Sequence, residues 1–235
     1  MKIQIEQPPC DKCFSNHDNV FCKLTHEQIK EMDHEKTCTI YPKNTNVFNE
    51  GNMPFGLYCI NRGKIKVFQS KRGGKKYIIR LAKEGDILGY RALISGEAYT
   101  GTATVLEEAT LCFVPKKLFF DFLKSNSDFS SKLIQLLSND LKNTEKKLAT
   151  MALKPVRERM AETLLMLNEF YGIDSEGFIK ISISREDIAN IVGTATETVI
   201  RILSEFKSEK MIELINKRIK IVDSEQLIIT ANIFD

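Results

Sequence analysis

The sequence predicts an α+β fold made of an antiparallel β-roll or barrel, then a long helix, then a winged helix-turn-helix. Residues 39–114 alternate short β-branched and aromatic runs with glycines, a spacing typical of antiparallel barrels and rolls. Residues 127–153 carry apolar side chains at alternating steps of three and four, which indicates one long helix. Residues 184–222 contain two short helical patterns followed by a hairpin sequence, the order of parts in a winged helix. A β-sandwich is the alternative for the first segment.

The length of 235 residues suits one large domain or two modest ones, and the hydrophobic share of 43% is normal for a packed protein. The first ten residues are polar, and no apolar run approaches the length that crosses a bilayer. We therefore expect a cytoplasmic protein that does not contact membranes. In that compartment the six cysteines should be reduced and serve in metal binding, redox chemistry or core packing rather than in structural disulfides.

Charge is distributed unevenly along the chain. Residues 1–153 carry 23 Lys and Arg against 17 Asp and Glu, whereas residues 154–235 carry 11 against 14. The part that contains the helix-turn-helix pattern is therefore slightly acidic. If this part binds nucleic acid, its basic side chains must gather on one face, because bulk charge does not supply the attraction.

Local signals place the elements around the β-rich segment. Residues 25–36 predict a short helix with Thr25 as its N-cap. Residues 115–125 predict another helix, and Pro155 ends the long helix that follows it. Residues 156–171 form a further amphipathic pattern, and residues 172–182 predict a turn with a short strand pair.

The long helix carries a heptad seam that favours pairing with the same helix of a second copy. The alternative is a single helix buried on its own domain. The seam residues are Ile134, Leu137, Leu141, Thr144, Leu148 and Met151.

The stretch from residue 184 to 206 predicts two helices joined by a tight turn. Ser184 is a natural N-cap, and Asp187 three residues later gives a capping-box-like pair. Gly193 is suited to end the first helix with a positive φ. Thr194 or Thr196 is expected to cap the second helix. Its buried stripe is predicted to be Val199, Ile202, Leu203 and Phe206.

The opposite face of this second helix suits the major groove of DNA. Arg201 can bridge guanine O6 and N7, and Glu197 can accept from cytosine N4. Lys217, Arg218 and Lys220 of the hairpin would lie near phosphates. An ordinary solvated helix is the alternative. The candidate DNA contacts are Arg185, Thr194, Thr196, Glu197, Ile200, Arg201 and Lys217.

The order of these parts resembles the Crp/Fnr superfamily of bacterial transcription regulators over nearly the whole chain. The resemblance is carried by residues 61–65 (NRGKI), 84–89 (EGDILG), 157–161 (RERMA), 185–189 (REDIA) and 196–203 (TETVIRIL). The last stretch matches the recognition-helix signature of the family. Oxygen-sensing members of the family place Ser where this chain has Ile200, which offers apolar contact such as that to a thymine methyl.

The resemblance implies a cyclic-nucleotide-binding-type β-roll (a double-stranded β-helix), a homodimer, a palindromic double-stranded operator and contact with RNA polymerase. Catalysis is not expected. The implied organisation is a cysteine-containing head (1–24), a β-roll effector domain (25–125), a dimerisation helix (126–153) and a winged helix-turn-helix DNA-binding domain (154–235).

Two branches of the superfamily differ in their effector. The cyclic-nucleotide branch needs a Glu after the Gly89 position and an Arg some ten residues on; here Tyr90 replaces the Glu, and no Arg stands near Tyr99 or Thr100. A phosphate in a partly buried pocket without its cation is costly, which argues against cyclic AMP. Arg91 is a conceivable substitute at a different position.

The oxygen-sensing branch holds an iron–sulfur cluster on three N-terminal cysteines and a fourth in a roll strand. By resemblance the ligands of a [4Fe-4S] cluster here are Cys10, Cys13, Cys22 and Cys112, although eight residues separate Cys13 from Cys22, more than is usual in that branch. Four thiolates also suit zinc. Cys38 and Cys59 are predicted to be core residues, and His17 is expected to be solvated.

The resulting hypothesis is a dimeric regulator that senses redox state, oxygen or nitric oxide through the cysteines and the packing of the long helix. A second hypothesis keeps the DNA-binding module with haem, a small ligand or no effector in the roll. A third is a thiol oxidoreductase that uses Cys10 and Cys13, but this pair lacks the expected βαβ context.

Overall fold

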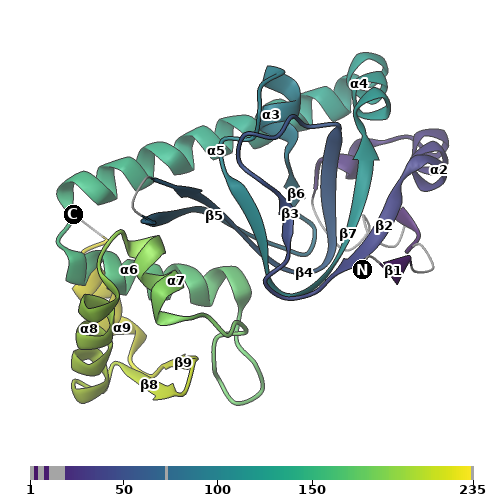
Figure 1. Ribbon diagram of the computed structural model, residues 1–235. Helices are drawn as coiled ribbons and strands as arrows, with labels where there is room; N and C mark the ends of the chain where they lie inside the picture. Colours follow the sequence, from purple (N-terminus) through teal and green to yellow (C-terminus); the bar gives the residue numbers. More distant parts are fainter. Residues whose placement is uncertain (1–2, 5–7, 11–18, 72–73, 234–235) are drawn as a thin grey trace. The chain divides into compact units, whose positions relative to one another are not determined.

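The computed structural model describes residues 3–4, 8–10, 19–71 and 74–233. They form two compact units, residues 1–142 and residues 143–235, and the boundary falls inside the long helix α5 (Ser127–Leu153). The first unit contains the β-rich roll, and the second contains the C-terminal helices with a two-stranded hairpin (Figure 1). Each unit is described by itself.

The first unit is built on an antiparallel sheet in which β7 is the central strand. The main strand order is β1-β2-β7-β4-β5, while β3 pairs with β7 and β6 pairs with β4. The prediction of an antiparallel roll is confirmed. The strands are β1 (Ile3–Gln4), β2 (Thr37–Tyr41), β3 (Asn46–Phe48), β4 (Gly56–Ser70), β5 (Lys76–Lys83), β6 (Ile87–Leu88) and β7 (Thr102–Pro115).

The sequence pattern suggests more strands than the structure has, because two pairs of runs merge. The runs on either side of Gly63 belong to the single strand β4, and the two runs of residues 101–114 belong to β7. The register between β4 and β7 shifts between Ile60 and Ile65, and Gly63 has a φ of 108° within this stretch. The glycine therefore bends a continuous strand instead of ending it.

Helices cover the roll at its ends. Helix α2 begins with the predicted Thr25 cap, whose hydroxyl accepts from the backbone N–H of Gln28 in a complete capping box. Figure 1 shows α2 beside β2, and α3 and α4 near the start of α5. The helical segments of this unit are η1 (Val20–Lys23), α2 (His26–Glu35), α3 (Tyr90–Ser95), α4 (Lys116–Ser125) and α5, which begins here.

Two apolar clusters form the core of the first unit. One lies inside the roll and includes Ile60, Ile65 and Leu111. The other lies between the roll and the helices, where Phe119 of α4 and Phe129 of α5 pack with their ring centroids 5.8 Å apart. The second cluster therefore joins the strands to the beginning of the long helix.

The second unit is a three-helix core with a hairpin and a terminal helix. The predicted pair of strands in residues 172–182 is reduced to one bridge, between Ile173 and Ile179. The structure adds helix α9 after the hairpin, an element for which the sequence analysis gives no expectation. None of the described helices is both long and apolar enough to cross a lipid bilayer. The elements are α6 (Val156–Tyr171), α7 (Arg185–Val192), α8 (Thr196–Ser208), β8 (Ile212–Ile215), β9 (Arg218–Ile221) and α9 (Ser224–Ala231).

We predict that Gly63→Ala destabilises the roll by about 2–5 kcal/mol. A Cβ at this position would lie 2.5 Å from the Ala109 Cβ and 2.8 Å from the Glu108 carbonyl oxygen, and the positive φ adds its own cost. Gly51→Ala is the control, since Gly51 also has a positive φ but its Cβ would meet nothing within 4 Å. Urea unfolding of both variants measures the difference, and equal losses would contradict the close approach of β4 to β7.

Candidate functional site

The helix-turn-helix is organised at its start by a serine cap and at its turn by a glycine. The Ser184 hydroxyl oxygen accepts from the backbone N–H of Asp187 at 3.0 Å, and the hydroxyl donates to the Asp187 carboxylate at 2.8 Å. Gly193 ends α7 with a φ of 72°. These features confirm the predicted cap and stop, which together set the angle at which α8 leaves α7.

The prediction that a threonine caps α8 is wrong. Ala195 occupies the N-cap position, with extended backbone angles. Thr196 is already the first helical residue, and Thr194 lies one residue before the cap, so neither hydroxyl has the cap geometry. Both threonine side chains are half-buried at the turn.

Helix α8 has one buried face and one exposed face, as predicted. The buried stripe packs within the second unit, and every one of its members is at most 2% exposed. On the other face Glu197 and Arg201 are exposed, and Ile200 between them is 54% exposed. The stripe consists of Val199, Ile202, Leu203 and Phe206.

Arg201 belongs to a chain of ion pairs that continues into α6. Its guanidinium contacts the Glu205 carboxylate one helical turn later. Arg157 donates to the other Glu205 oxygen at 2.9 Å and to Glu209 at 2.6 Å, and its guanidinium lies 4.7 Å from the centre of the Phe206 ring. Glu205 is therefore shared between a packed arginine on α6 and the exposed arginine of α8.

The hairpin between β8 and β9 is the predicted wing, but it presents fewer basic groups than expected. Lys217 is exposed at its tip, next to Asn216 with its φ of 54°. Arg218 instead donates to Asp174 at 2.7 Å, contacts Glu176 at 2.9 Å and lies over the Phe178 ring. The Arg218 guanidinium holds the pKa of the Asp174 carboxyl below its usual value.

Two further contacts involve a basic group next to the wing, Arg185, and one on the wing, Lys220. Arg185, at the start of α7, donates from Nη2 to the Asn216 carbonyl oxygen at 3.1 Å, which ties the helix-turn-helix to the wing tip. The Lys220 ammonium lies 3.8 Å from a Glu213 carboxylate oxygen across the hairpin. Of the predicted wing cations Lys217, Arg218 and Lys220, Lys217 is exposed at the tip and the other two are partly buried.

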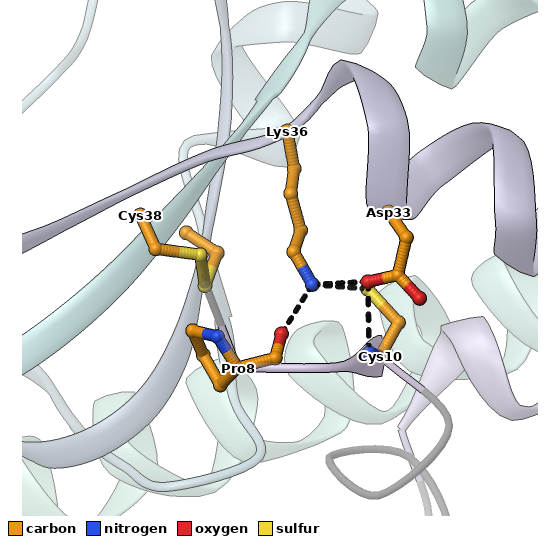
Figure 2. Close-up of a disulfide and its surroundings, with 6 residues drawn as sticks. Pro8, Cys10, Asp33, Lys36 and Cys38 are labelled. Atoms are coloured by element: carbon orange, nitrogen blue, oxygen red, sulfur yellow. Dashed lines mark hydrogen bonds and ion pairs between the residues drawn. A yellow bond between two sulfur atoms is a disulfide. The ribbon is translucent and has the colours of Figure 1, made fainter. Parts of the chain in front are cut away.

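The cysteines lie only partly as predicted, since Cys38 and Cys59 are buried in the apolar core as expected. Cys112 on β7 forms a disulfide with Cys38 on β2, the bond between two sulfur atoms in Figure 2. The two residues are directly opposite each other in the antiparallel register. The expectation that all six cysteines are reduced is therefore wrong for this pair, and Cys38 is more than a packing residue. Cys10 is buried and Cys22 is exposed, each with its thiol, and Cys13 lies outside the described residues.

Cys10 lies in a polar pocket formed by Lys36 and Asp33. The Lys36 ammonium donates to the Cys10 sulfur at 3.0 Å, to the Pro8 carbonyl oxygen and to the Asp33 carboxylate, while the Cys10 N–H donates to Asp33 at 2.9 Å (Figure 2). Burial raises the pKa of the Cys10 thiol to about 12 despite the ammonium beside it, so Cys10 is a neutral thiol at physiological pH.

The three predicted metal ligands that the structure describes, Cys10, Cys22 and Cys112, do not form a thiolate site in this state, and the four-cysteine site stays a prediction. Cys112 is oxidised by its bond to Cys38, and the Cys10 sulfur is held by a cation. Within the part of the chain that the structure describes, no three His, Cys, Asp or Glu side chains lie close enough together to hold a metal ion. The disulfide and a cluster that uses Cys112 are mutually exclusive.

The roll has a wide, open pocket of about 610 Å³ beside Phe48, Met53 and Phe113, and a second pocket of about 50 Å³ next to Arg80. Tyr90 lines the second pocket. Arg80 donates to the Tyr90 hydroxyl at 3.0 Å, and that hydroxyl donates to Asp140 on α5. Arg80, the cation beside this pocket, is therefore hydrogen-bonded to Tyr90, the residue at the position where the cyclic-nucleotide branch has a Glu.

Sequence reasoning did not single out Lys36, Arg157 or Glu205. The spacing of four residues between Arg201 and Glu205 is that of a helical ion pair and could have revealed this contact. The role of Arg157 depends on how α6 packs on α8. Nothing in the local sequence indicates that Lys36 is buried against Cys10.

A β-roll linked through a long helix to a winged helix-turn-helix defines a DNA-binding transcription regulator with an effector-type domain. Residues 39–126 match the cyclic nucleotide-binding domain, and residues 158–228 match the Crp-like helix-turn-helix domain. These segments cover more than half of the chain, which belongs to the Crp/Fnr family of transcription regulators.

Two relatives within the family carry different names. The chain is 26% identical over 230 residues to the fumarate and nitrate reduction regulatory protein of Vibrio cholerae, covering 95% of this chain and 90% of that protein. It is 27% identical over 189 residues to the CRP-like cAMP-activated global transcriptional regulator of Mycobacterium tuberculosis, covering 80% and 84%.

Solved structures show the same fold. FixK2 from Bradyrhizobium japonicum matches with a TM-score of 0.74 and 20% identity, covering 82% of this chain and 95% of that chain. A CRP/FNR family regulator from Thermus thermophilus matches with a TM-score of 0.71 and 21% identity, covering 83% and 98%.

We predict that Glu205→Gln tightens DNA binding about three- to tenfold. The change removes the carboxylate that holds Arg201 and a negative charge close to the expected path of the phosphates. Glu209→Gln is the matched control, because Glu209 pairs with Arg157 but not with Arg201. Fluorescence anisotropy with labelled duplex DNA measures both, and weaker binding by Glu205→Gln would show that the ion pair orients Arg201 productively.

Proposed function

We propose that this protein acts as a homodimeric, sequence-specific transcription regulator in which α8 of each copy enters the major groove of a palindromic operator. The observation that carries this proposal is the exposed face of α8 over a fully buried stripe. Arg201 supplies a bidentate donor for guanine, Glu197 an acceptor for cytosine, and Ile200 an apolar contact for a thymine methyl.

The remaining candidate contacts surround this helix. Arg185 and Lys217 lie beside the wing tip and are proposed to contact phosphates, which position the helix without reading sequence. Thr194 and Thr196 at the turn are proposed to donate to the backbone of the same strand. Contact with RNA polymerase is an expectation from family membership.

The dimer is proposed to form along α5. Ile134, Leu141 and Leu148 are spaced seven residues apart and are 63%, 60% and 71% exposed, although they are large apolar side chains. Leu137 of the predicted seam instead packs against the core of the first unit. A row of exposed apolar residues at heptad spacing is buried most simply by the same row of a second copy.

The signal is proposed to be redox state, sensed at cysteines. Supporting this is the similarity to the fumarate and nitrate reduction regulatory protein and the presence of Cys10, Cys38, Cys59 and Cys112 in one buried cluster next to α5. The predicted [4Fe-4S] cluster on Cys10, Cys13, Cys22 and Cys112 stays a prediction; it would require reduction of the Cys38–Cys112 disulfide that the structure contains. Cyclic AMP is not proposed, because Tyr90 stands where that branch has a Glu and no Arg stands near Tyr99 or Thr100 in the sequence.

We predict that Arg201→Ala reduces operator discrimination by about 5- to 150-fold, the equivalent of one lost bidentate base contact of roughly 1–3 kcal/mol. The probe is a duplex selected from random sequence with the full-length protein, compared with the same duplex carrying one altered half-site. Lys217→Ala is the control, since loss of a phosphate contact should weaken binding to both duplexes alike. Unchanged discrimination by the Arg201 variant would contradict base reading by α8.

We predict that Leu141→Asp converts a dimer into monomers and weakens binding to the selected duplex at least tenfold, because it puts a charge in the centre of the heptad row. Asn139→Asp introduces the same charge at an exposed position off the seam and should leave the dimer intact. Light scattering coupled to gel filtration gives the mass. A Leu141→Asp protein that remains dimeric would place the interface elsewhere.

A further inference from the structure

Three buried cysteines lie side by side on three neighbouring strands of the roll. Cys112 on β7 is directly opposite Cys38 on β2, and on its other side it is directly opposite Cys59 on β4. Opposed residues of antiparallel strands project from the same face with their Cβ atoms about 4.5–5.5 Å apart. Cys112 is therefore the middle member of a row, within disulfide reach of both neighbours.

Cys38 and Cys59 cannot reach each other in the same way. They lie two strands apart, which is about 9–10 Å at the usual strand spacing. In the structure the bond joins Cys38 to Cys112, and Cys59 keeps its thiol. All three side chains belong to the apolar cluster that also contains Phe129 and Leu133 of α5.

We infer that this row, Cys38–Cys112–Cys59, is a reversible thiol–disulfide site whose oxidant is hydrogen peroxide and whose shared member is Cys112. The thiolate of Cys112 attacks one peroxide oxygen, the O–O bond breaks, and water leaves once the departing oxygen is protonated. Cys38 then attacks the Cys112 sulfur, the S–O bond breaks, and a second water leaves as the disulfide forms. Two thiols have lost two electrons and two protons to the peroxide.

Cys59 provides an exchange partner that needs no further oxidant. Its thiolate attacks the Cys112 sulfur, the bond to Cys38 breaks, and Cys38 leaves as a thiolate that takes up the proton lost by Cys59. A dithiol reductant returns the row to three thiols and itself becomes a disulfide. The two possible bonds tie β7 either to β2 or to β4.

The surroundings of the row link it to the rest of the unit. Cys38 follows Lys36 by two residues, and Lys36 holds Pro8, Cys10 and Asp33 together (Figure 2). On the other side the row packs in the cluster that contains the beginning of α5. Reduction replaces a bond by two thiols that need van der Waals separation, so the packing beneath α5 must change with redox state.

The effect on DNA rests on the proposed function, but the chemistry of the row is testable without DNA. Full-length protein is reduced, freed of reductant, treated with hydrogen peroxide, alkylated, and analysed by peptide mass spectrometry. We expect a Cys38–Cys112 disulfide in the parent protein and a Cys59–Cys112 disulfide in the Cys38→Ser variant. In the Cys112→Ser variant no disulfide should join the two remaining row members. Cys22→Ser, which changes an exposed cysteine outside the row, should leave the parent pattern intact.

Several results would overturn the inference. These are the lack of any disulfide at Cys112 after peroxide, a Cys38–Cys59 bond in Cys112→Ser, or a Cys38→Ser protein whose Cys59 stays reduced. Iron and acid-labile sulfide are measured on the same protein prepared without air. Stoichiometric amounts that Cys112→Ser removes would also overturn it, because Cys112 would then belong to a metal cluster.

Measuring how tightly the reduced and the oxidised protein bind the selected duplex distinguishes failure of the redox site from failure of the proposed sensing function. We expect at least a tenfold difference in affinity for the parent protein and none for Cys112→Ser. If the predicted disulfides form but affinity does not change, the redox site stands and the proposed sensing function fails. If the disulfides do not form while affinity still responds to peroxide, the site is wrong and sensing occurs elsewhere.

Discussion

The pairing of β7 on both of its edges is the constraint on which the first unit depends. This strand is hydrogen-bonded to β2 and β3 on one side and to β4 on the other, and it then leads through α4 into α5. The close approach at Gly63 sets where β4 bends against it. The same pairing places Cys112 between two cysteines, so one register determines both the shape of the roll and its sulfur chemistry.

In the second unit, the basic side chains that face solvent are determined by which of them are paired within the unit, and not by the net charge. Arg157, Arg218 and Arg185 are each engaged within the unit, by carboxylates or by the carbonyl at the wing tip. Arg201 and Lys217 are exposed to solvent, and Arg201 also forms an ion pair with Glu205. A slightly acidic domain can thus present cations locally, because carboxylates of the same domain pair with other cations such as Arg157 and Arg218.

Most features that depend on local sequence were predictable, apart from the cap of α8 and helix α9, and those that depend on long-range register were not. The Thr25 and Ser184 caps, the stop at Gly193 and the span of α5 follow from patterns within a few residues. The Cys38–Cys112 bond joins residues 74 apart, and only the pairing of β2 with β7 reveals it. Likewise Arg218 reads as a wing cation in sequence, yet Asp174 from a distant loop engages it, and the family resemblance could not show either contact.

Operator recognition by the proposed dimer requires two copies of α8 that contact guanine in two half-sites of one duplex. Chemical footprinting of the full-length reduced protein on the selected duplex, with methylation interference at guanine N7, tests this most directly. We predict two protected half-sites centred about one helical turn, roughly 10 base pairs, apart, each losing binding when a guanine is methylated. A single protected half-site, or protection that guanine methylation does not affect, would contradict it.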